Sequence, residues 1–486
     1  MDDRRRSIKL STIRGTLWTY ASLFSGRAVM FVSTIVLARL LSQDDYGVAA
    51  YATVFIAFLE VVGDLGVGAA LIYHRDDPEA SHTGFWLNLG AGVALFALTW
   101  LAAPLVGQFY QDERAVGVTR ALGVYFPISA LGNIHSALLY RNLAFGRRFL
   151  PNLVRNAGKG VVAIVLAWLG FGAYSLIWGQ VAGVGLAVIA FWFAVPWQPA
   201  LRFVTAHVRP LLSYGLRMIS INFLSVLSAN LDYLFIGRYL GAAPLGVYTL
   251  AFRIPDLLIS QACSVITTVA FPVYASLRNE PELLRESFLS TNRFLMVAIA
   301  PIGVGLALLA GPVVLTFFTD KWQAAIPVMP AIAIYALTTS LFYNAGDVFK
   351  AIGKPEYLTY ITLVELVVMA PAMWWAVTQP ASIVAVAWVH VGVAVFERTL
   401  NLLVARRVLG LSIGAVLQTL RPALIGSALM AAAVLVTLAL LPDAALVRLA
   451  AATAVGGAVY LGSLWVFERQ LVLSSGRMLW AAVGRK

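Results

Sequence analysis

The sequence is poor in charged residues and contains a single cysteine. Charged residues make up 12% of its 486 residues and hydrophobic residues 60%, whereas soluble domains average roughly 25% and 45–50%. We therefore interpret the chain as an integral membrane protein. Cys263 has no second cysteine with which to form an intrachain disulfide, and a lone thiol cannot build a cysteine-cluster metal site.

Motifs of several common catalytic classes are also missing. No G-x-x-x-x-G-K-[ST] occurs, which excludes nucleotide hydrolysis by a P-loop, and neither H-E-x-x-H nor G-x-S-x-G is present. The five histidines are scattered along the chain. We expect a protein that is not an enzyme and that holds no metal and no cofactor.

Long apolar runs separated by short turns fill most of the chain. About 20 helical residues span a bilayer core about 30 Å thick, and lipid offers backbone groups no hydrogen-bond partner. The runs lack the alternation of barrel strands, so the predicted fold is all-α with fourteen transmembrane helices. The predicted spans are residues 16–41, 46–72, 83–109, 118–140, 149–169, 173–196, 211–240, 245–275, 288–318, 326–350, 356–377, 382–404, 414–441 and 448–467.

The Lys and Arg residues are distributed unevenly between alternate loops. If the N-terminus is cytoplasmic, the external loops hold only Arg114, Lys321 and Arg448, while the other loops and both termini hold most of the rest. Because cytoplasmic loops are enriched in Lys and Arg, we predict that both termini are cytoplasmic. The net charge of +12 then reflects topology and does not indicate a nucleic-acid partner.

One stretch of sequence recurs 199 positions further along. "VLARLLSQDDYGVAAYA" at 36–52 and "FIGRYLGAAPLGVYTLA" at 235–251 align Arg39 with Arg238 and Gly47 with Gly246. We predict that the two arginines end equivalent helices at the external interface. Each glycine is expected either to let a neighbouring backbone approach or to relieve the turn before its helix.

The repeat predicts two parallel six-helix lobes around a central cavity, followed by a C-terminal helix pair. The expected segments are a cytoplasmic amphipathic N-terminus at 1–15, an N-lobe at 16–200, a C-lobe at 201–410, the helix pair at 411–470 and a cytoplasmic tail at 471–486.

Several motifs in order along the chain resemble one transporter family. "VLARLLSQDDYGVAAYA", "FWLNLGAG" at 85–92, "LFIGRYLGAAPLGVYTLAFRIPD" and "DKWQAAIPVM" at 320–329 are similar to the polysaccharide-transport branch of the multidrug/oligosaccharidyl-lipid/polysaccharide superfamily. The likeness is greatest to oligosaccharide flippases of the colanic acid and teichuronic acid exporter type. It runs from about residue 10 to 410 and predicts the family without specifying the glycan.

The resemblance implies a function and a location. Such a flippase moves an undecaprenyl-pyrophosphate-linked oligosaccharide from the cytoplasmic to the outer leaflet of the bacterial inner membrane, through a cavity lined by helices 1, 2, 7 and 8. A membrane polymerase or export complex is a candidate partner, and the lobes enclose their own cavity, so a monomer suffices. Arginines in that cavity would bind the anionic headgroup, and the candidates here are Arg27, Arg217 and Arg253. Structural pairing or snorkelling is the alternative role for each.

Carboxylates inside the spans form a second set of candidates. Glu60 and Asp64 share one helix face, and Asp256 follows Arg253 by three residues. These three and Asp232 are candidates for coupling to a proton or cation, or for pairing with an arginine. A second tier consists of Arg155, Lys159, Glu365, His390 and Glu397.

Cys263 follows Asp256 by seven residues. In an uninterrupted α-helix the two side chains share a face, so we predict that Cys263 borders the same water-filled wall and reacts with polar thiol reagents.

Two other functions fit part of the sequence. A membrane glycosyltransferase would use Asp44 and Asp45 as paired carboxylates, although their loop is only about five residues long. A cation-coupled multidrug exporter of the same superfamily would favour carboxylates in its cavity, whereas the first, seventh and eighth predicted helices offer arginines.

Overall fold

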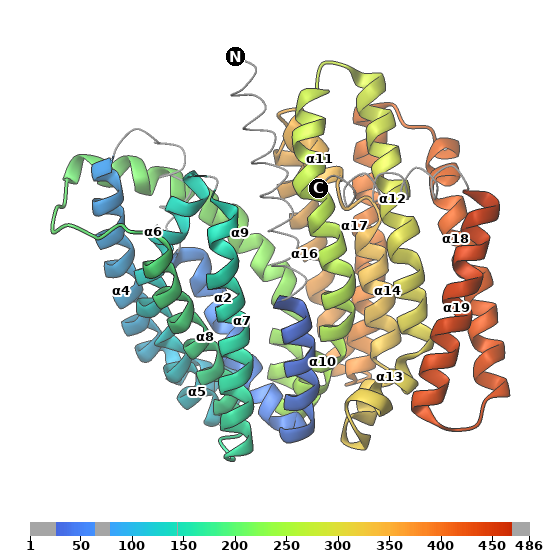
Figure 1. Cartoon of the computed structure of the whole chain (residues 1–486), viewed down its shortest axis with the longest axis horizontal. Helices are drawn as coiled ribbons and strands as arrows, with labels where there is room; N and C mark the ends of the chain where they lie inside the picture. The colour runs from blue at the N-terminus through green and yellow to red at the C-terminus, as the bar shows by residue number, and fades with distance from the viewer. Residues whose placement is uncertain (1–25, 64–77, 143, 469–486) are drawn as a thin grey trace. The chain divides into compact units, whose positions relative to one another are not determined.

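A computed structural model describes residues 26–63, 78–142 and 144–468 (Figure 1). Every regular element within these ranges is a helix, so the predicted all-α class is confirmed for the described part of the chain. The described residues form two compact units, one within residues 1–249 and one within residues 250–486. Ten of the described helices are long and apolar enough to cross a membrane.

The first unit is a bundle of long helices, drawn in blue and green in Figure 1. Its elements are a helix over residues 26–40, α2 (Gln43–Gly63), α4 (Pro78–Tyr110), α5 (Arg114–Gly123), α6 (Tyr125–Arg141), α7 (Phe145–Trp168), α8 (Ala173–Ala194), α9 (Thr205–Tyr239) and the first part of α10 (Ala242–Pro255). Helix α7 packs along α8, α4 along α6, and α2 against α9.

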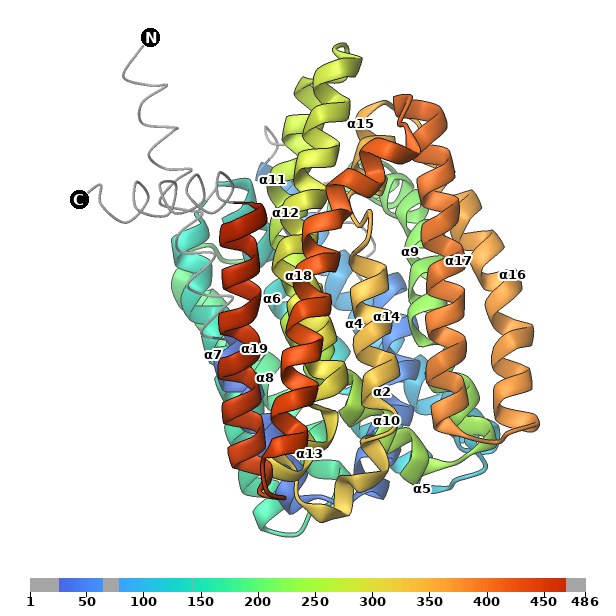
Figure 2. The same cartoon turned by 90° about the vertical axis from the view of Figure 1, so that its right-hand side faces the viewer.

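The second unit begins in the last turns of α10 (Figure 2). It continues with η1 (Asp256–Ser260), α11 (Gln261–Ser276), α12 (Pro281–Leu308), α13 (Ala310–Phe317), η2 (Asp320–Ala325), α14 (Met329–Ser340), α15 (Ala345–Ala351), α16 (Glu356–Thr378), α17 (Ile383–Leu409), α18 (Ile413–Leu440) and α19 (Ala445–Phe467). Figure 2 shows α18 and α19 side by side, and the two helices are in extensive contact.

The predicted spans coincide with helices wherever the structure describes them, but four of them are not single α-helices. The span predicted at 288–318 is divided into α12 and α13 at Leu309, and the span predicted at 326–350 is divided into α14 and α15 by residues 341–344. The span predicted at 118–140 is divided into α5 and α6 at Val124. Pro127 has no N–H to donate to the carbonyl of Gly123, four residues earlier, so the helical ladder is broken there. The span predicted at 245–275 is interrupted by the π-helical turn η1, which directly follows Pro255.

Two glycines related by the repeat bring α2 and α10 into backbone contact. A Cβ atom at Gly47 would lie 1.8 Å from the carbonyl oxygen of Ala242, and one at Gly246 would lie 1.8 Å from that of Gln43. Gln43 and Ala242 are themselves 199 residues apart, so the two contacts are equivalent under the repeat. Of the two roles expected of each glycine, the approach of a neighbouring backbone is the one that is confirmed.

The repeat also places two arginines at equivalent helix ends. Arg39 is the penultimate residue of the helix over 26–40, and Arg238 is the penultimate residue of α9. Arg39 is exposed, and the guanidinium carbon of Arg238 lies 5.7 Å from the centre of the Tyr239 ring. The lobe boundary near residue 200 rests on the sequence repeat and stays a prediction.

Candidate functional site

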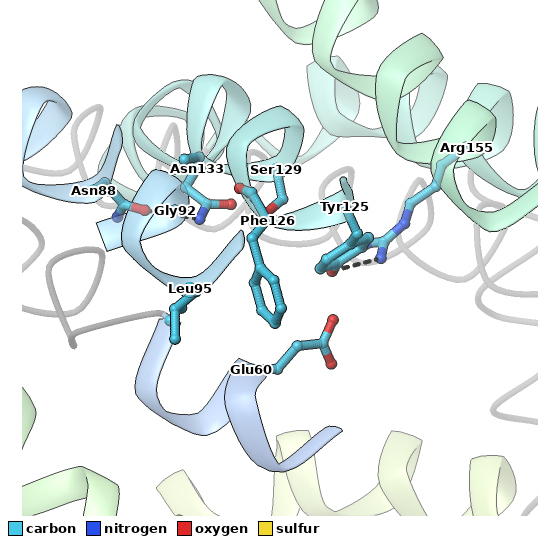
Figure 3. Close-up of a pocket in the computed structure, with 11 residues that line it drawn as sticks. Glu60, Asn88, Gly92, Leu95, Tyr125, Phe126, Ser129, Asn133 and Arg155 are labelled. Carbon is cyan, nitrogen blue, oxygen red and sulfur yellow. Dashed lines mark hydrogen bonds between the residues drawn. The ribbon is translucent and has the colours of Figure 1, made fainter. Parts of the chain in front are cut away.

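A polar cavity of about 290 Å³ lies within the first unit (Figure 3). Its walls come from the end of α2, the first half of α4, the start of α6 and one residue of α7. The lining residues are Glu60, Gly63, Asn88, Gly92, Leu95, Tyr125, Phe126, Ser129, Ala130, Asn133 and Arg155.

In the cavity, one guanidinium and one carboxylate both interact with the hydroxyl group of the same tyrosine. Arg155 Nη2 donates a long hydrogen bond of 3.5 Å to the hydroxyl oxygen of Tyr125. The Glu60 carboxylate points toward the same hydroxyl in Figure 3 and interacts with it electrostatically. Glu60 and Arg155 were predicted separately, as a coupling or pairing carboxylate and as a second-tier cation, and the fold brings them to one cavity.

A pair of amides forms another part of the wall. Asn133 Nδ2 donates to Asn88 Oδ1 at 3.1 Å, and Figure 3 shows Phe126 between this pair and Glu60. Asn88 is only 1% exposed, and its Nδ2 is buried without a hydrogen-bond partner among the described residues. The cavity therefore offers uncharged donors and acceptors beside its two charges.

Close packing at a glycine sets the distance between the two amides. A Cβ atom at Gly92 would lie 2.9 Å from the backbone carbonyl oxygen of Phe126, so only glycine lets α4 approach α6 this closely at that level. Asn88 lies four residues before Gly92 on the same face of α4. The approach places it against Asn133 of α6.

A G-x-x-x-G pattern on α8 positions the basic residues of α7. Cβ atoms at Gly179 and Gly183 would lie 2.8 Å and 2.6 Å from the carbonyl oxygens of Lys159 and Arg155, so the two backbones meet there. Lys159 Nζ then donates to Gln180 Oε1 of α8 at 3.3 Å. Lys159 thus contacts α8, while Arg155 lines the cavity.

Two other predicted residues of the first unit, Arg27 and Asp232, are not among the described residues that line this cavity. Asp232 is fully buried in α9 and accepts a hydrogen bond of 2.8 Å from the Tyr248 hydroxyl. Arg27 is half-buried in the helix over 26–40. Arg217 belongs to α9, but its side chain lies outside the described part of the structure, as does the whole of Asp64.

In the second unit, the expectation for Cys263 is wrong. Its side chain is 1% exposed and belongs to an apolar cluster that includes Leu295 and Ile299. The π-helical turn that starts at Asp256 is wider than an α-helical turn, so residues before and after it do not keep the α-helical register. Asp256 and Arg253 are both half-buried near this turn.

A second cluster of predicted residues lies between α16 and α17. Glu397 pairs with Arg398 at 2.7 Å and accepts a hydrogen bond of 2.6 Å from Asn401 Nδ2. Glu365 of α16 is close enough to interact with Glu397 electrostatically. These contacts hold the Glu397 carboxylate against two side chains of its own helix.

His390 packs as an aromatic side chain. It is 4% exposed, and its ring centre lies 4.1 Å from that of Tyr335. Among residues 26–63, 78–142 and 144–468, no three His, Cys, Asp or Glu side chains gather in a way that could hold a metal ion.

Sequence reasoning missed the uncharged members of the cavity. The sequence does not predict Asn88, Tyr125, Ser129 and Asn133, because charged groups stand out within apolar spans and uncharged polar groups do not. Polar uncharged residues in such spans are the signal that could have found them. Asn88 stands within "FWLNLGAG", which was singled out only as a family motif.

The chain is similar in sequence to proteins of bacterial polysaccharide synthesis. A family model described as "Polysaccharide biosynthesis protein" matches residues 36–327. The teichuronic acid biosynthesis protein TuaB of Bacillus subtilis (strain 168) is 29% identical over 87% of this chain and 88% of its own. The succinoglycan biosynthesis transport protein ExoT of Rhizobium meliloti (strain 1021) is 26% identical over 94% of each chain.

Solved transporter structures share the fold. The lipid II flippase MurJ in an inward closed conformation matches with a TM-score of 0.79 at 15% identity, covering 94% of this chain and all of that one. An inward-facing multidrug transporter of the MATE family matches with a TM-score of 0.65 at 18% identity, covering 81% of this chain and 98% of that one.

Proposed function

We propose a function for this chain from its family: it belongs to the polysaccharide biosynthesis protein family, whose model covers more than half of its length. The family resemblance predicted from its motifs is thereby confirmed. The chain acts as a flippase, which moves an undecaprenyl-pyrophosphate-linked oligosaccharide from the cytoplasmic to the outer leaflet of the bacterial inner membrane by alternating access.

One observation carries this proposal. A relative named as a succinoglycan biosynthesis transport protein is similar along 94% of both chains, so the likeness is not confined to one segment. The fold shared with MurJ is consistent with a lipid-linked cargo. The names of the same relatives indicate a transporter rather than an enzyme.

The finer membrane arrangement belongs to the proposal. We place fourteen transmembrane helices in the chain with both termini cytoplasmic, and two six-helix lobes around a central cavity. The match between predicted spans and described helices supports this count, and the uneven Lys and Arg distribution supports the orientation. The flippase works as a monomer and delivers its cargo to a membrane polymerase or export complex.

The anionic headgroup of the cargo requires fixed positive charge within the membrane. We assign this role to Arg27, Arg217 and Arg253. Arg27 and Arg253 are half-buried in their own units, as expected for arginines that border water within apolar helices.

Reconstituted protein tests the proposal directly. In liposomes that contain undecaprenyl-pyrophosphate-linked oligosaccharide, the wild type should move the lipid between leaflets, and Arg27→Ala and Arg253→Ala should bind it roughly 10- to 100-fold more weakly. Lysine at either position should restore part of the binding as a point charge. Wild-type transport by both alanine variants would remove these arginines from the site, and no transport by the wild type would overturn the function.

A cation-coupled multidrug exporter is the alternative function, and its fold is also shared. Such a protein would bind small cations at an excess of carboxylates, whereas the described residues that line the cavity of the first unit include one carboxylate and one guanidinium. Drug resistance on overexpression, together with unchanged glycan export after deletion of the gene, would favour the alternative.

A glycosyltransferase is disfavoured by the contacts of Asp44 and Asp45. Asp45 accepts hydrogen bonds from the backbone and hydroxyl of Ser42 at 2.9 and 2.6 Å, which caps the start of α2. Asp44 forms an ion pair with Arg114. Both carboxylates are therefore engaged in holding the turn rather than presented as a catalytic pair.

A further inference from the structure

We propose that the cavity of the first unit binds a sugar ring of the cargo rather than its pyrophosphate. This inference rests on the proposed flippase function, because it names the part of the same cargo that this cavity recognises. In this proposal, the side chains that form hydrogen bonds with the sugar hydroxyls are Asn88, Asn133, Tyr125, Glu60 and Arg155.

The balance of charge argues against an ionic ligand. Arg155 and Glu60 contribute one positive and one negative formal charge to the same wall. A pyrophosphate receptor needs an excess of cations, and a receptor for a cationic drug needs an excess of carboxylates. A neutral ligand with many hydroxyl groups matches a wall whose described charges cancel and whose groups both donate and accept hydrogen bonds.

The amide pair suits neighbouring hydroxyl groups. Asn88 and Asn133 already share one hydrogen bond of 3.1 Å, which fixes their orientation, and Asn88 Nδ2 is buried without a partner among the residues described. An unsatisfied buried donor costs roughly 1–3 kcal/mol, which a ligand oxygen would recover. Ser129, one turn before Asn133 on α6, adds a hydroxyl to the same face.

The size of the cavity fits one ring rather than a whole oligosaccharide. Its volume of about 290 Å³ is at the lower end of the roughly 300–1,000 Å³ that small-molecule pockets occupy. Tyr125 and Phe126 contribute aromatic rings to the wall, which can pack against the apolar C–H groups of a sugar. The remaining rings of the glycan would lie outside this cavity.

The depth of the cavity agrees with a transport site. Asn88 lies ten residues after the start of α4, and Arg155 lies ten residues after the start of α7. At 1.5 Å per residue, both lie about 15 Å from those helix starts, which the proposed orientation places at the cytoplasmic side. The predicted spans begin at residues 83 and 149, so Asn88 and Arg155 lie five and six residues, about 8 and 9 Å, inside them. The cavity therefore lies in the cytoplasmic half of the membrane, on the side from which the proposed function loads its cargo.

A pair of lipid probes separates the sugar from the headgroup. The first probe is undecaprenyl pyrophosphate without sugar, and the second is the lipid-linked oligosaccharide fraction extracted from the strain that carries this gene. Binding of each to the full-length protein in nanodiscs is measured for the wild type, for Asn133→Leu and for Glu60→Gln. Asn142→Leu is the matched control, because Asn142 is exposed at the end of the same helix and does not line the cavity.

We expect both cavity variants to lose about tenfold in affinity for the sugar-bearing lipid, as removal of one or two hydrogen bonds implies. Their affinity for the sugar-free lipid should stay within about twofold of the wild type, which also shows that they are folded, and the control should bind both lipids normally.

Equal losses for both lipids would make the cavity a headgroup receptor and overturn the inference. Unchanged binding of both lipids, or a wild type that does not distinguish them, would also overturn it while the flippase function stands. A wild type that binds neither lipid would instead contradict the proposed function.

Discussion

Arg114 binds two aspartates beside the turn between α4 and α5. Its Nε and Nη2 donate to the two oxygens of Asp112 at 3.0 and 2.8 Å, and it also pairs with Asp44 at the start of α2. One guanidinium thus connects three helix ends. The hydrogen bonds from Arg114 lower the pKa of Asp112 below its ordinary value of 3.8.

This pairing predicts a pH dependence of stability. Because the pKa of Asp112 is lower in the folded protein than in the unfolded chain, the pairing stabilises the fold at neutral pH and loses this effect as the pH falls below about 4 and passes through the folded pKa. Asp112→Asn should lower the free energy of unfolding at pH 6 by up to about 1 kcal/mol, since the guanidinium is partly exposed. Thermal unfolding of both proteins between pH 3 and 6 should show the difference shrinking toward pH 3. A difference that is constant over this range would contradict the assignment.

At the scale of single residues, the charged residues of the cavity were predictable from the sequence, and its uncharged polar residues were not. Glu60 and Arg155 stand out because ionisable groups are costly in a membrane span, and both were predicted as candidates. Asn88 and Asn133 carry no charge and lie 45 residues apart. They become a pair only because Gly92 lets α4 approach α6. That approach is a property of tertiary packing, which helical periodicity does not contain.

At the scale of helices, the π-helical turn η1 changes the helical register before Cys263, and the resulting burial of the thiol predicts how slowly it reacts. Cys263 is 1% exposed within an apolar cluster, and a thiol that water does not reach does not form the reactive thiolate. A polar maleimide should therefore label the native protein at least about tenfold more slowly than it labels an exposed thiol. The comparison is Cys263→Ala combined with Asn279→Cys, since Asn279 is exposed in the turn after α11. Comparable labelling of the two proteins would show that Cys263 reaches water.

The reciprocal contact of α2 and α10 makes a second prediction at this scale. Gly47→Ala and Gly246→Ala each place a Cβ atom 1.8 Å from a backbone oxygen, a clash that only separation of the helices can relieve. Each should lower the free energy of unfolding by about 2 kcal/mol or more, measured by thermal or denaturant unfolding in detergent. The two effects should be similar, because the contacts are equivalent under the repeat.

Gly90→Ala is the matched control for these two variants. Nothing lies within 4 Å of a Cβ atom at Gly90 of α4, so alanine there should be neutral or stabilise the helix by up to about 1 kcal/mol. Mild effects at Gly47 and severe effects at Gly246, or the reverse, would show that the repeat does not extend to this contact.

Apolar length predicted where the helices lie, and proline chemistry explains two of the four places where a predicted span is not a single α-helix. Hydropathy responds to the average over about 20 residues, so it passes over the break at Val124 and the π-turn after Pro255. Both irregularities depend on one missing backbone N–H. The break at Val124 could have been predicted from the sequence, because Pro127 cannot donate a hydrogen bond to the carbonyl of Gly123. A π-turn after a proline is harder to predict, since a proline can also kink a helix.

At the scale of the whole molecule, composition alone predicted the membrane class, and the repeat predicted equivalent helix ends. Orientation across the membrane depends instead on where basic residues lie. Arg141, Arg147 and Arg148 surround the connection between α6 and α7, whereas Arg114 is the single basic residue beside the turn between α4 and α5. Basic loops stay on the cytoplasmic side, so the first connection is predicted to be cytoplasmic and the second external.

Two introduced cysteines test this orientation in intact cells. In a Cys263→Ala background, Glu113→Cys and Asn142→Cys each place one thiol at an exposed position of these two connections. A membrane-impermeant maleimide should label Glu113→Cys in spheroplasts, and should label Asn142→Cys only after the membrane is permeabilised. The same result would place the Gly47 contact between α2 and α10 on the external side. The reversed pattern would invert the proposed direction of every helix and would place the starts of α4 and α7, from which the depth of the sugar cavity is measured, on the external side.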